Sequence, residues 1–253
     1  MHFLIAPNIG ALLFLGLSMA AFASAFFGVF AGAAGGVILL AAMALVVPAP
    51  VLVPVHTVVM LGAGATRTAI MWRYVMQKTL LPYLIGAAAG AALGAKVFVA
   101  LPISLSLGIL GLFILVVTWM PTLGRLGAER GRFVLLGFVT TFLGIFVSAT
   151  GTLLAPFVAS AAPERRNHSA TLGALMMTTH IAKLIAFGVM GFAIGPFLPL
   201  AIAMIAASAA GNWAGKVALG HTSEGRFRLI FQIVLTALSL RLLWSAARGL
   251  GYL

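Results

Sequence analysis

Basic side chains inside long apolar segments are the feature of this sequence with most potential for binding chemistry. His180 and Lys183 are three residues apart in the apolar stretch 168–194, so a helix places both on one face. His56 and Arg67 lie in an earlier apolar stretch. A cation in a membrane segment is costly and usually faces a cavity or a partner. None of the three acidic residues lies in such a segment, so the pattern favours an anionic ligand.

Neighbouring polar residues could join the same site. Thr66 precedes Arg67, Thr179 precedes His180, and Asn212 stands inside a further small-residue helix. His180 could donate a hydrogen bond, and a histidine ordinarily changes charge between about pH 5 and 8. The competing interpretation is that the basic residues snorkel to the membrane interface or cap a helix end there, which suits Arg67 best.

Glycine-rich breaks at 32–36 and 148–152 interrupt two other apolar stretches, 9–47 and 133–160. Unwound backbone at membrane depth is tolerated only where protein buries it or it lines a cavity. Free N–H groups at the N-terminus of a half-helix bind anions. Close packing of helices through small residues explains the same composition equally well. The residues of these breaks that we assign to the candidate site are Gly32, Gly35, Gly36, Ser148, Thr150, Gly151 and Thr152.

Composition indicates which elements hold these residues. Apolar residues make up 63% of 253 positions and charged residues 7%, against about 25% charged in soluble domains. Lipid must therefore replace water over most of the surface, and we expect an all-α polytopic membrane protein. The chain has 15 Lys and Arg residues and only three acidic residues. This excess of positive charge either sets the membrane topology through the loops or attracts an anionic solute. The apolar stretches are 9–47, 52–72, 79–100, 103–120, 133–160, 168–194, 196–219 and 227–247.

Several classes of chemistry are excluded by the residues present. Cysteine is absent, so disulfides and thiolate sites are excluded. The five histidines form no zinc signature, and there is no phosphate-binding loop for a nucleotide. We therefore expect no metal, no cofactor and no nucleic acid partner. No cationic region precedes the first apolar run, so we also expect no cleaved signal peptide.

The two halves of the sequence resemble each other. The stretch 28–36 matches 144–152 at an offset of 116 residues, and 91–97 matches 211–217 at an offset of 120. Thr66 before Arg67 parallels Thr179 before His180 at an offset of 113. Ordered matches with a slowly drifting offset indicate an internal repeat. We place the first repeat at 1–127 and the second at 128–253.

Loop charge predicts how the segments cross the membrane. If all eight segments cross, the four basic loops divide evenly between the two sides, against the positive-inside tendency. If 9–47 and 133–160 are re-entrant hairpins, all four basic loops fall on one side. Each half then has three crossings, which makes the repeats inverted, as in many transporters. We expect these loops in the cytoplasm and both termini outside; the loops are 73–78, 121–132, 161–167 and 218–228.

Three motifs carry a resemblance to a known family. They are G-x-x-x-G-A-A-G-G-V-I-L at 28–39, its echo G-I-F-V-S-A-T-G-T-L-L-A-P at 144–156, and G-A-A-x-G-A-A-L-G-A-K at 86–96. With their order and spacing, the chain from about 10 to 247 resembles the TauE/SafE family of sulfite-exporter-like permeases. Thr152 departs from the family pattern, because a glycine-type residue is usual there.

The resemblance implies transport of a small sulfur-containing anion, usually outward, across a bacterial inner membrane. Sulfite, sulfonates such as sulfoacetate, thiosulfate and other organosulfur anions are the implied substrates. The partners expected are this anion and membrane lipid, with a monomer or a homodimer as the assembly. The alternative is a membrane enzyme or assembly subunit without transport. It is disfavoured because the usual sets of base, nucleophile and metal ligand do not converge in this sequence.

Overall fold

A computed structural model of the chain describes most of the sequence, and every structural statement below concerns that part. The described residues are 10–31, 34–47, 49–99, 102–119, 131–147, 151–192, 195–218, 236, 239–240 and 243–251.

The described residues form helices and connections, with no strand among them, as the composition predicts. Among the described residues, five helices are long and apolar enough to cross a membrane: α1, α3, α4, α8 and α9. Side chains such as Leu81, Ile85 and Ile202 are exposed on them, as expected where lipid covers the surface. The helix bounds are α1 Ala11–Ala31, α2 Ala34–Ala44, α3 Ala49–Met71, α4 Leu80–Val99, α5 Ile103–Trp119, α6 Arg132–Val147, α7 Gly151–Ala161, α8 Arg165–Val189 and α9 Leu198–Ala218.

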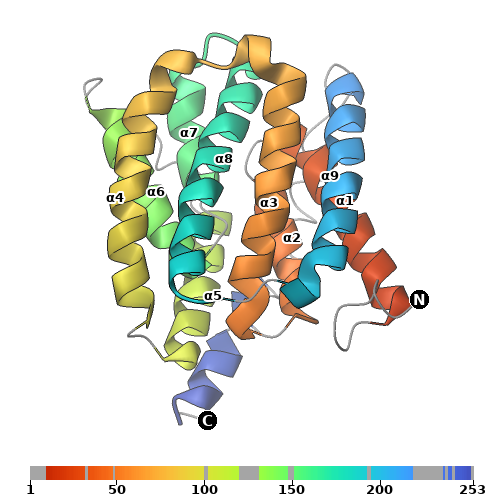
Figure 1. Ribbon diagram of the computed structural model, residues 1–253, viewed down its shortest axis with the longest axis vertical. Coiled ribbons are helices and arrows are strands. Elements are labelled where there is room, and N and C mark those ends of the chain that lie inside the picture. The colour runs from red at the N-terminus through yellow and green to blue at the C-terminus, as the bar shows by residue number, and fades with distance from the viewer. Residues whose placement is uncertain are drawn as a thin grey trace.

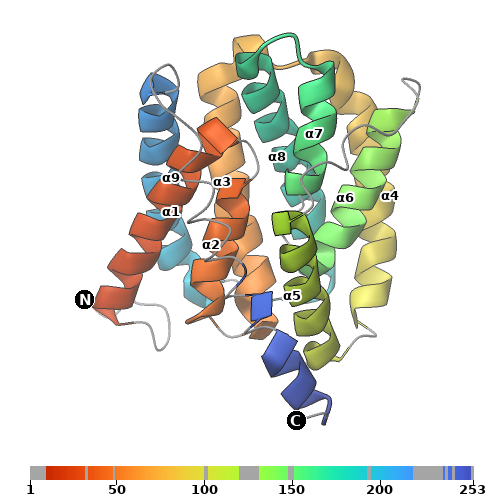
Figure 2. The same ribbon diagram turned by 180° about the vertical axis from the view of Figure 1, so that it is seen from behind.

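Each glycine-broken stretch holds two helices rather than one. The first is divided between α1 and α2, and the second between α6 and α7. Helices α1 and α2 run in opposite directions and form a hairpin (Figure 2). In this hairpin the Ser24 hydroxyl donates to the Gly35 carbonyl at 2.5 Å, and a Cβ on Gly35 would meet the Gly28 Cα. The predicted breaks are confirmed as helix ends, although α1 alone is also long enough to span a bilayer.

Small residues let α1 and α6, the first helices of the two glycine-broken stretches, pack closely on long helices of the other half. Helix α1 packs on α9, and α6 packs on α4. A Cβ on Gly211 of α9 would collide with the Phe22 carbonyl oxygen, and one on Gly90 of α4 with the Phe138 carbonyl oxygen. Backbones this close are typical of small-residue interfaces in membranes. The third large contact, between α3 and α8, lies in the middle of the molecule (Figure 1).

The helix boundaries follow the offsets found in the sequence. Helices α1 and α6 end 116 residues apart, at Ala31 and Val147, and α3 and α8 begin 116 residues apart. Helices α4 and α9 begin 118 residues apart. Helix α1 thus corresponds to α6, α3 to α8 and α4 to α9. The contact of α1 with α9 is then equivalent to the contact of α6 with α4, and α3 packs on its own counterpart, α8. The central helix pair is therefore where matching positions of the two halves meet.

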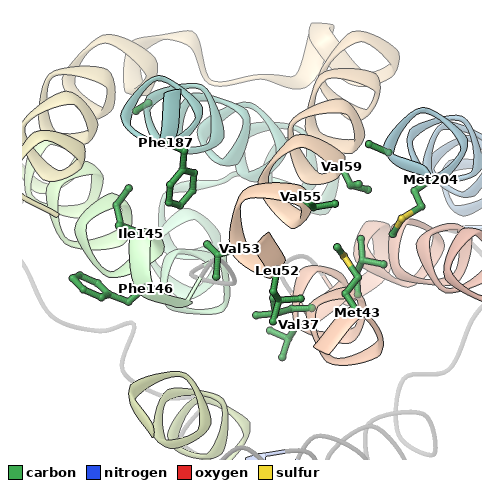
Figure 3. Packing of buried hydrophobic residues seen from close by; sticks show 14 of the residues in the cluster. Val37, Met43, Leu52, Val53, Val55, Val59, Ile145, Phe146, Phe187 and Met204 are labelled. Carbon is green, nitrogen blue, oxygen red and sulfur yellow. The ribbon is translucent and has the colours of Figure 1, made fainter. Parts of the chain in front are cut away.

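Buried apolar side chains from α2, α3, α6, α8 and α9 fill the centre of the bundle. Figure 3 shows Val37 and Met43 beside Leu52 and Val55, with Phe187 and Ile145 across the core. All of these side chains are buried. The core thus surrounds the α3–α8 contact, so a polar side chain on the facing surfaces of these helices is shielded from lipid.

The basic connections gather at one end of the bundle. The α3–α4 and α7–α8 connections, the start of α6 and the end of α9 all lie at the top of Figure 1. Arg73 and Lys78 lie in the first connection, and Arg165 begins the helix after the second. The predicted loops 121–132 and 218–228 lie largely outside the described residues. The described basic loops share one end, as the hairpin arrangement predicts.

Candidate functional site

The central basic cluster consists of His56 on α3 with His180 and Lys183 on α8. Their exposed fractions are 0%, 1% and 0%, so none of the three reaches lipid or the interface. Lys183 follows His180 by one turn on α8, and α3, which holds His56, packs against α8. The prediction that His180 and Lys183 face one side of their helix is confirmed by this burial. The interpretation of Lys183 as an interfacial cap is wrong.

Each member of the central basic cluster is held differently. The His56 Nε2 donates to the Gly36 carbonyl at 3.0 Å, which ties α3 to the start of α2. The Lys183 ammonium lies 6.0 Å from the centre of the Phe187 ring, one turn further along α8. The His180 Nδ1 is buried and has no hydrogen-bond partner among the described residues. A buried ring nitrogen of this kind can donate to or accept from a bound ligand.

A hydroxyl network next to His180 was not predicted from the sequence. The fully buried Tyr83 hydroxyl lies 2.6 Å from the Thr140 hydroxyl and 2.7 Å from the Thr179 hydroxyl. These residues come from α4, α6 and α8, so the network fixes the rotation of α8 just before His180. The signal that could have revealed it is a tyrosine inside an apolar segment, because a buried phenol hydroxyl needs a partner.

Arg67 lies in a second group, which we call the arginine cluster. Its Nε donates to the Asn212 Oδ1 at 3.3 Å. The Asn212 amide donates at 2.9 Å to the Thr66 hydroxyl and at 2.9 Å to the Ala63 carbonyl. Arg67 is 8% exposed, so the snorkelling interpretation is wrong for this residue. Sequence spacing did not reveal this contact, because residues 67 and 212 lie on different helices of different halves.

The two clusters are separate. His56 and Arg67 are eleven residues apart on α3, which corresponds to about 16 Å along a helix at 1.5 Å per residue. The predicted site residues are thus divided between two levels of the α3–α8 contact, and Arg67 is at the level nearer the α3–α4 connection. Thr66 and Asn212 belong to the arginine cluster, and Thr179 lies beside the central basic cluster.

The residues of the glycine breaks are only partly described. Gly35, Gly36 and Gly151 are buried, and Gly36 reaches the central basic cluster through its carbonyl. Thr152 lies in α7, and its side chain is outside the description. Gly32, Ser148 and Thr150 also lie outside the described residues. Among the residues searched, no group of histidines and acids could hold a metal ion.

Comparison with known families adds to this geometry. A family model described as "Sulfite exporter TauE/SafE" matches residues 17–242. The chain belongs to this family. Neither the comparison with curated proteins nor that with solved structures found a match. As a TauE/SafE protein with five helices able to span a bilayer, it is a multi-pass membrane protein of a transporter family.

Two other basic residues in the described part of this TauE/SafE chain lie at the bundle surface. Lys96 and Lys216 are exposed in the last turns of α4 and α9, as snorkelling residues are. Trp213 is 64% exposed and is placed as an interfacial tryptophan would be. The buried cations Arg67 and Lys183 therefore differ in kind from these surface lysines.

Proposed function

We propose that this protein is a secondary transporter that carries a small sulfur-containing anion across the bacterial inner membrane. Sulfite is the substrate that the family description names. We include sulfonates such as sulfoacetate because their charged group is a similar sulfur oxyanion. The observation that carries the proposal is the central basic cluster, where Lys183, His56 and His180 are all buried inside the bundle. An ammonium in a low-dielectric interior costs several kcal/mol of solvation, which a bound anion offsets.

The arrangement of the helices supports alternating access to this cluster. We propose that residues 1–127 and 128–253 are inverted repeats, each with a re-entrant hairpin and three crossings. Their central helices, α3 and α8, run in opposite directions and contact each other (Figure 1). Inverted repeats bind substrate near the midplane where they meet, often at broken helices. Gly36, at a break, bonds to His56 of the cluster.

The orientation proposed follows from charge. The end of the bundle with the α3–α4 and α7–α8 connections faces the cytoplasm, because basic loops stay on that side. The anion would then meet the arginine cluster before the central basic cluster when it leaves the cell. Both chain termini would lie outside.

Transport by reconstituted protein is the direct test. Purified protein in liposomes should take up or release labelled sulfite and sulfoacetate faster than empty liposomes. Labelled rubidium ion serves as a non-substrate control for leak. Equal rates with and without protein for every sulfur anion tested would reject the proposal.

A further inference from the structure

We propose that His180 takes up one proton when the central basic cluster binds a doubly charged sulfur oxyanion, so that such an anion crosses the membrane together with that proton. This role rests on the proposed transport function and deepens it, because it names the group that lets the site hold two negative charges. Lys183 supplies at most one positive charge to the cluster, so a second must come from another group.

The Nδ1 atom of His180 has no hydrogen-bond partner among the described residues, and the side chain is 1% exposed. Leaving a buried polar atom unpaired is unfavourable, so such an atom calls for a ligand or another explanation. In a neutral imidazole Nδ1 either donates or accepts, depending on the tautomer, whereas in the imidazolium both ring nitrogens donate. Protonation therefore gives an anion a donor at Nδ1 and adds a positive charge.

Backbone contacts fix the register of α3 against α8, which run in opposite directions (Figure 1). A Cβ on Gly64 of α3 would lie 3.4 Å from the Gly173 carbonyl oxygen and 3.4 Å from the Met177 backbone nitrogen of α8. Each step back along α3 is then matched by a step forward along α8. Position 56 lies eight residues before Gly64, so it is opposite the residues eight later on α8, which are 181–185.

This register brings the members of the central basic cluster to one level of the bundle. Lys183 is among the residues opposite His56, and His180 precedes Lys183 by about 4.5 Å along the same face of α8. The hydrogen bond between the Thr179 and Tyr83 hydroxyls, 2.7 Å long, holds α8 one residue before His180. An anion beside Lys183 is therefore also beside His180.

Few other titratable groups face His180 from the elements packed on α8. Helix α3 presents His56, whose Nε2 donates to the Gly36 carbonyl, and α4 presents Tyr83, whose hydroxyl is bonded to two threonines. Helix α7 has no titratable side chain, and Glu164, the only acidic residue described, is exposed at the start of α8. The other titratable residues of α8 and of the described elements around it lie nearer the basic connections or at the surface; they are Arg67, Arg73, Tyr74, Lys96, Arg132, Arg165, Arg166 and His168.

Charge balance explains why the proton accompanies a second negative charge. A second buried cation beside Lys183 is unfavourable unless another negative charge offsets its desolvation. A singly charged sulfonate is balanced by Lys183 alone, whereas thiosulfate or the sulfite dianion leaves one negative charge over. A proton on the His180 Nδ1 balances that charge and donates a charge-assisted hydrogen bond to an oxygen of the anion. The N–H bond forms when the anion enters and breaks when it leaves, so the proton crosses with the anion.

The pH dependence of thiosulfate binding tests this role of His180. Thiosulfate keeps both charges throughout the range in which a histidine ordinarily titrates, about pH 5–8, whereas sulfite itself gains a proton there. The Kd for thiosulfate is measured on detergent-purified wild type and on His180→Asn, which keeps a hydrogen-bonding group near the Nδ1 position and takes up no proton. The ratio of the variant Kd to the wild-type Kd should rise about tenfold for each unit by which the pH is lowered, the slope that one proton gives.

Matched controls isolate the charge of the anion and the position of the histidine. Methanesulfonate carries one charge, and for it the same ratio should not change with pH. His168→Gln replaces another histidine of α8, twelve residues before His180, and should keep the wild-type Kd for thiosulfate at every pH.

A measurement on the wild type alone keeps the test decisive if His180→Asn does not fold. In weakly buffered solution, saturating thiosulfate should take up one proton more per chain than saturating methanesulfonate does. A pH electrode records this difference without any substitution.

The outcomes separate the role of His180 from the proposed function. A thiosulfate Kd ratio that is independent of pH, equal proton uptake with the two anions, or a wild type that transports sulfite and fails to bind thiosulfate overturns the role of His180 and leaves transport intact. Loss of the pH dependence in His56→Asn, with His180→Asn behaving as wild type, also overturns it, because the proton would then lie on α3. A protein that neither binds nor transports any sulfur anion overturns both proposals.

Discussion

Replacing Lys183 by methionine is the sharpest perturbation of the proposed transport site. Methionine keeps most of the side-chain length and volume and removes the charge from a position that is 0% exposed. An ammonium and an anion about 4 Å apart interact by about 4 kcal/mol at an effective dielectric constant near 20. At about 1.4 kcal/mol per factor of ten, sulfite affinity should fall about 1000-fold.

Protein stability should respond in the opposite direction. Removing a buried charge removes its desolvation cost, and apolar replacements of buried ionic groups are often neutral or stabilising by about 1–4 kcal/mol. The Lys183→Met protein should therefore unfold at the wild-type temperature or above. Loss of transport in a variant of undiminished stability would tie the defect to the site and not to folding.

The assay is initial sulfite flux in proteoliposomes over a range of sulfite concentrations, with thermal unfolding measured on the same preparations. At the wild-type KM, Lys183→Met should transport at the rate of empty liposomes. Lys96→Met is the matched control, because Lys96 is exposed on α4, and it should keep the wild-type KM. A Lys183→Met protein with wild-type KM and maximal rate would refute the reasoning, and the site would then rest on backbone amides and hydroxyls.

Three other predictions concern the surrounding structure. Tyr83→Phe removes the hydrogen bond that orients α8 beside the central basic cluster. This substitution should lower the free energy of unfolding by about 1 kcal/mol and raise the sulfite KM severalfold, which thermal unfolding and flux assays measure. Gly90→Leu should prevent stable folding, since its side chain would enter the backbone of α6, whereas Gly16→Leu, in open space, should be tolerated; yields of monodisperse protein decide. Single cysteines at Arg73 and Gly191, in this cysteine-free chain, should be labelled from the cytoplasmic and the outer side respectively, and labelling of both from one side would contradict the proposed topology.

Much of the architecture could be predicted because it depends on local sequence. Composition requires a lipid environment. The glycine-rich stretches at 32–36 and 148–152 lie inside apolar runs that are long for a single helix, so the division of α1 from α2 and of α6 from α7 could be predicted from the chain itself. The repeat offset likewise aligned helices that begin 116 residues apart. Helical periodicity placed His180 and Lys183 on one face, and the cost of a cation in a membrane segment suggested that this face is internal.

The grouping of the polar residues was decided by tertiary structure. Spacing along one helix cannot tell which helix lies opposite, so Arg67 was grouped with His180, whereas packing of α3 on α9 gives it Asn212 as a partner. The same limit hid the contact of Tyr83 with Thr179, 96 residues away in the chain. These contacts depend on how closely glycine-lined backbones approach, which is a property of helix pairs. The sequence by itself therefore determined the membrane class, the breaks and the inward-facing cations, and only the packed bundle decided that those cations form two clusters about 16 Å apart.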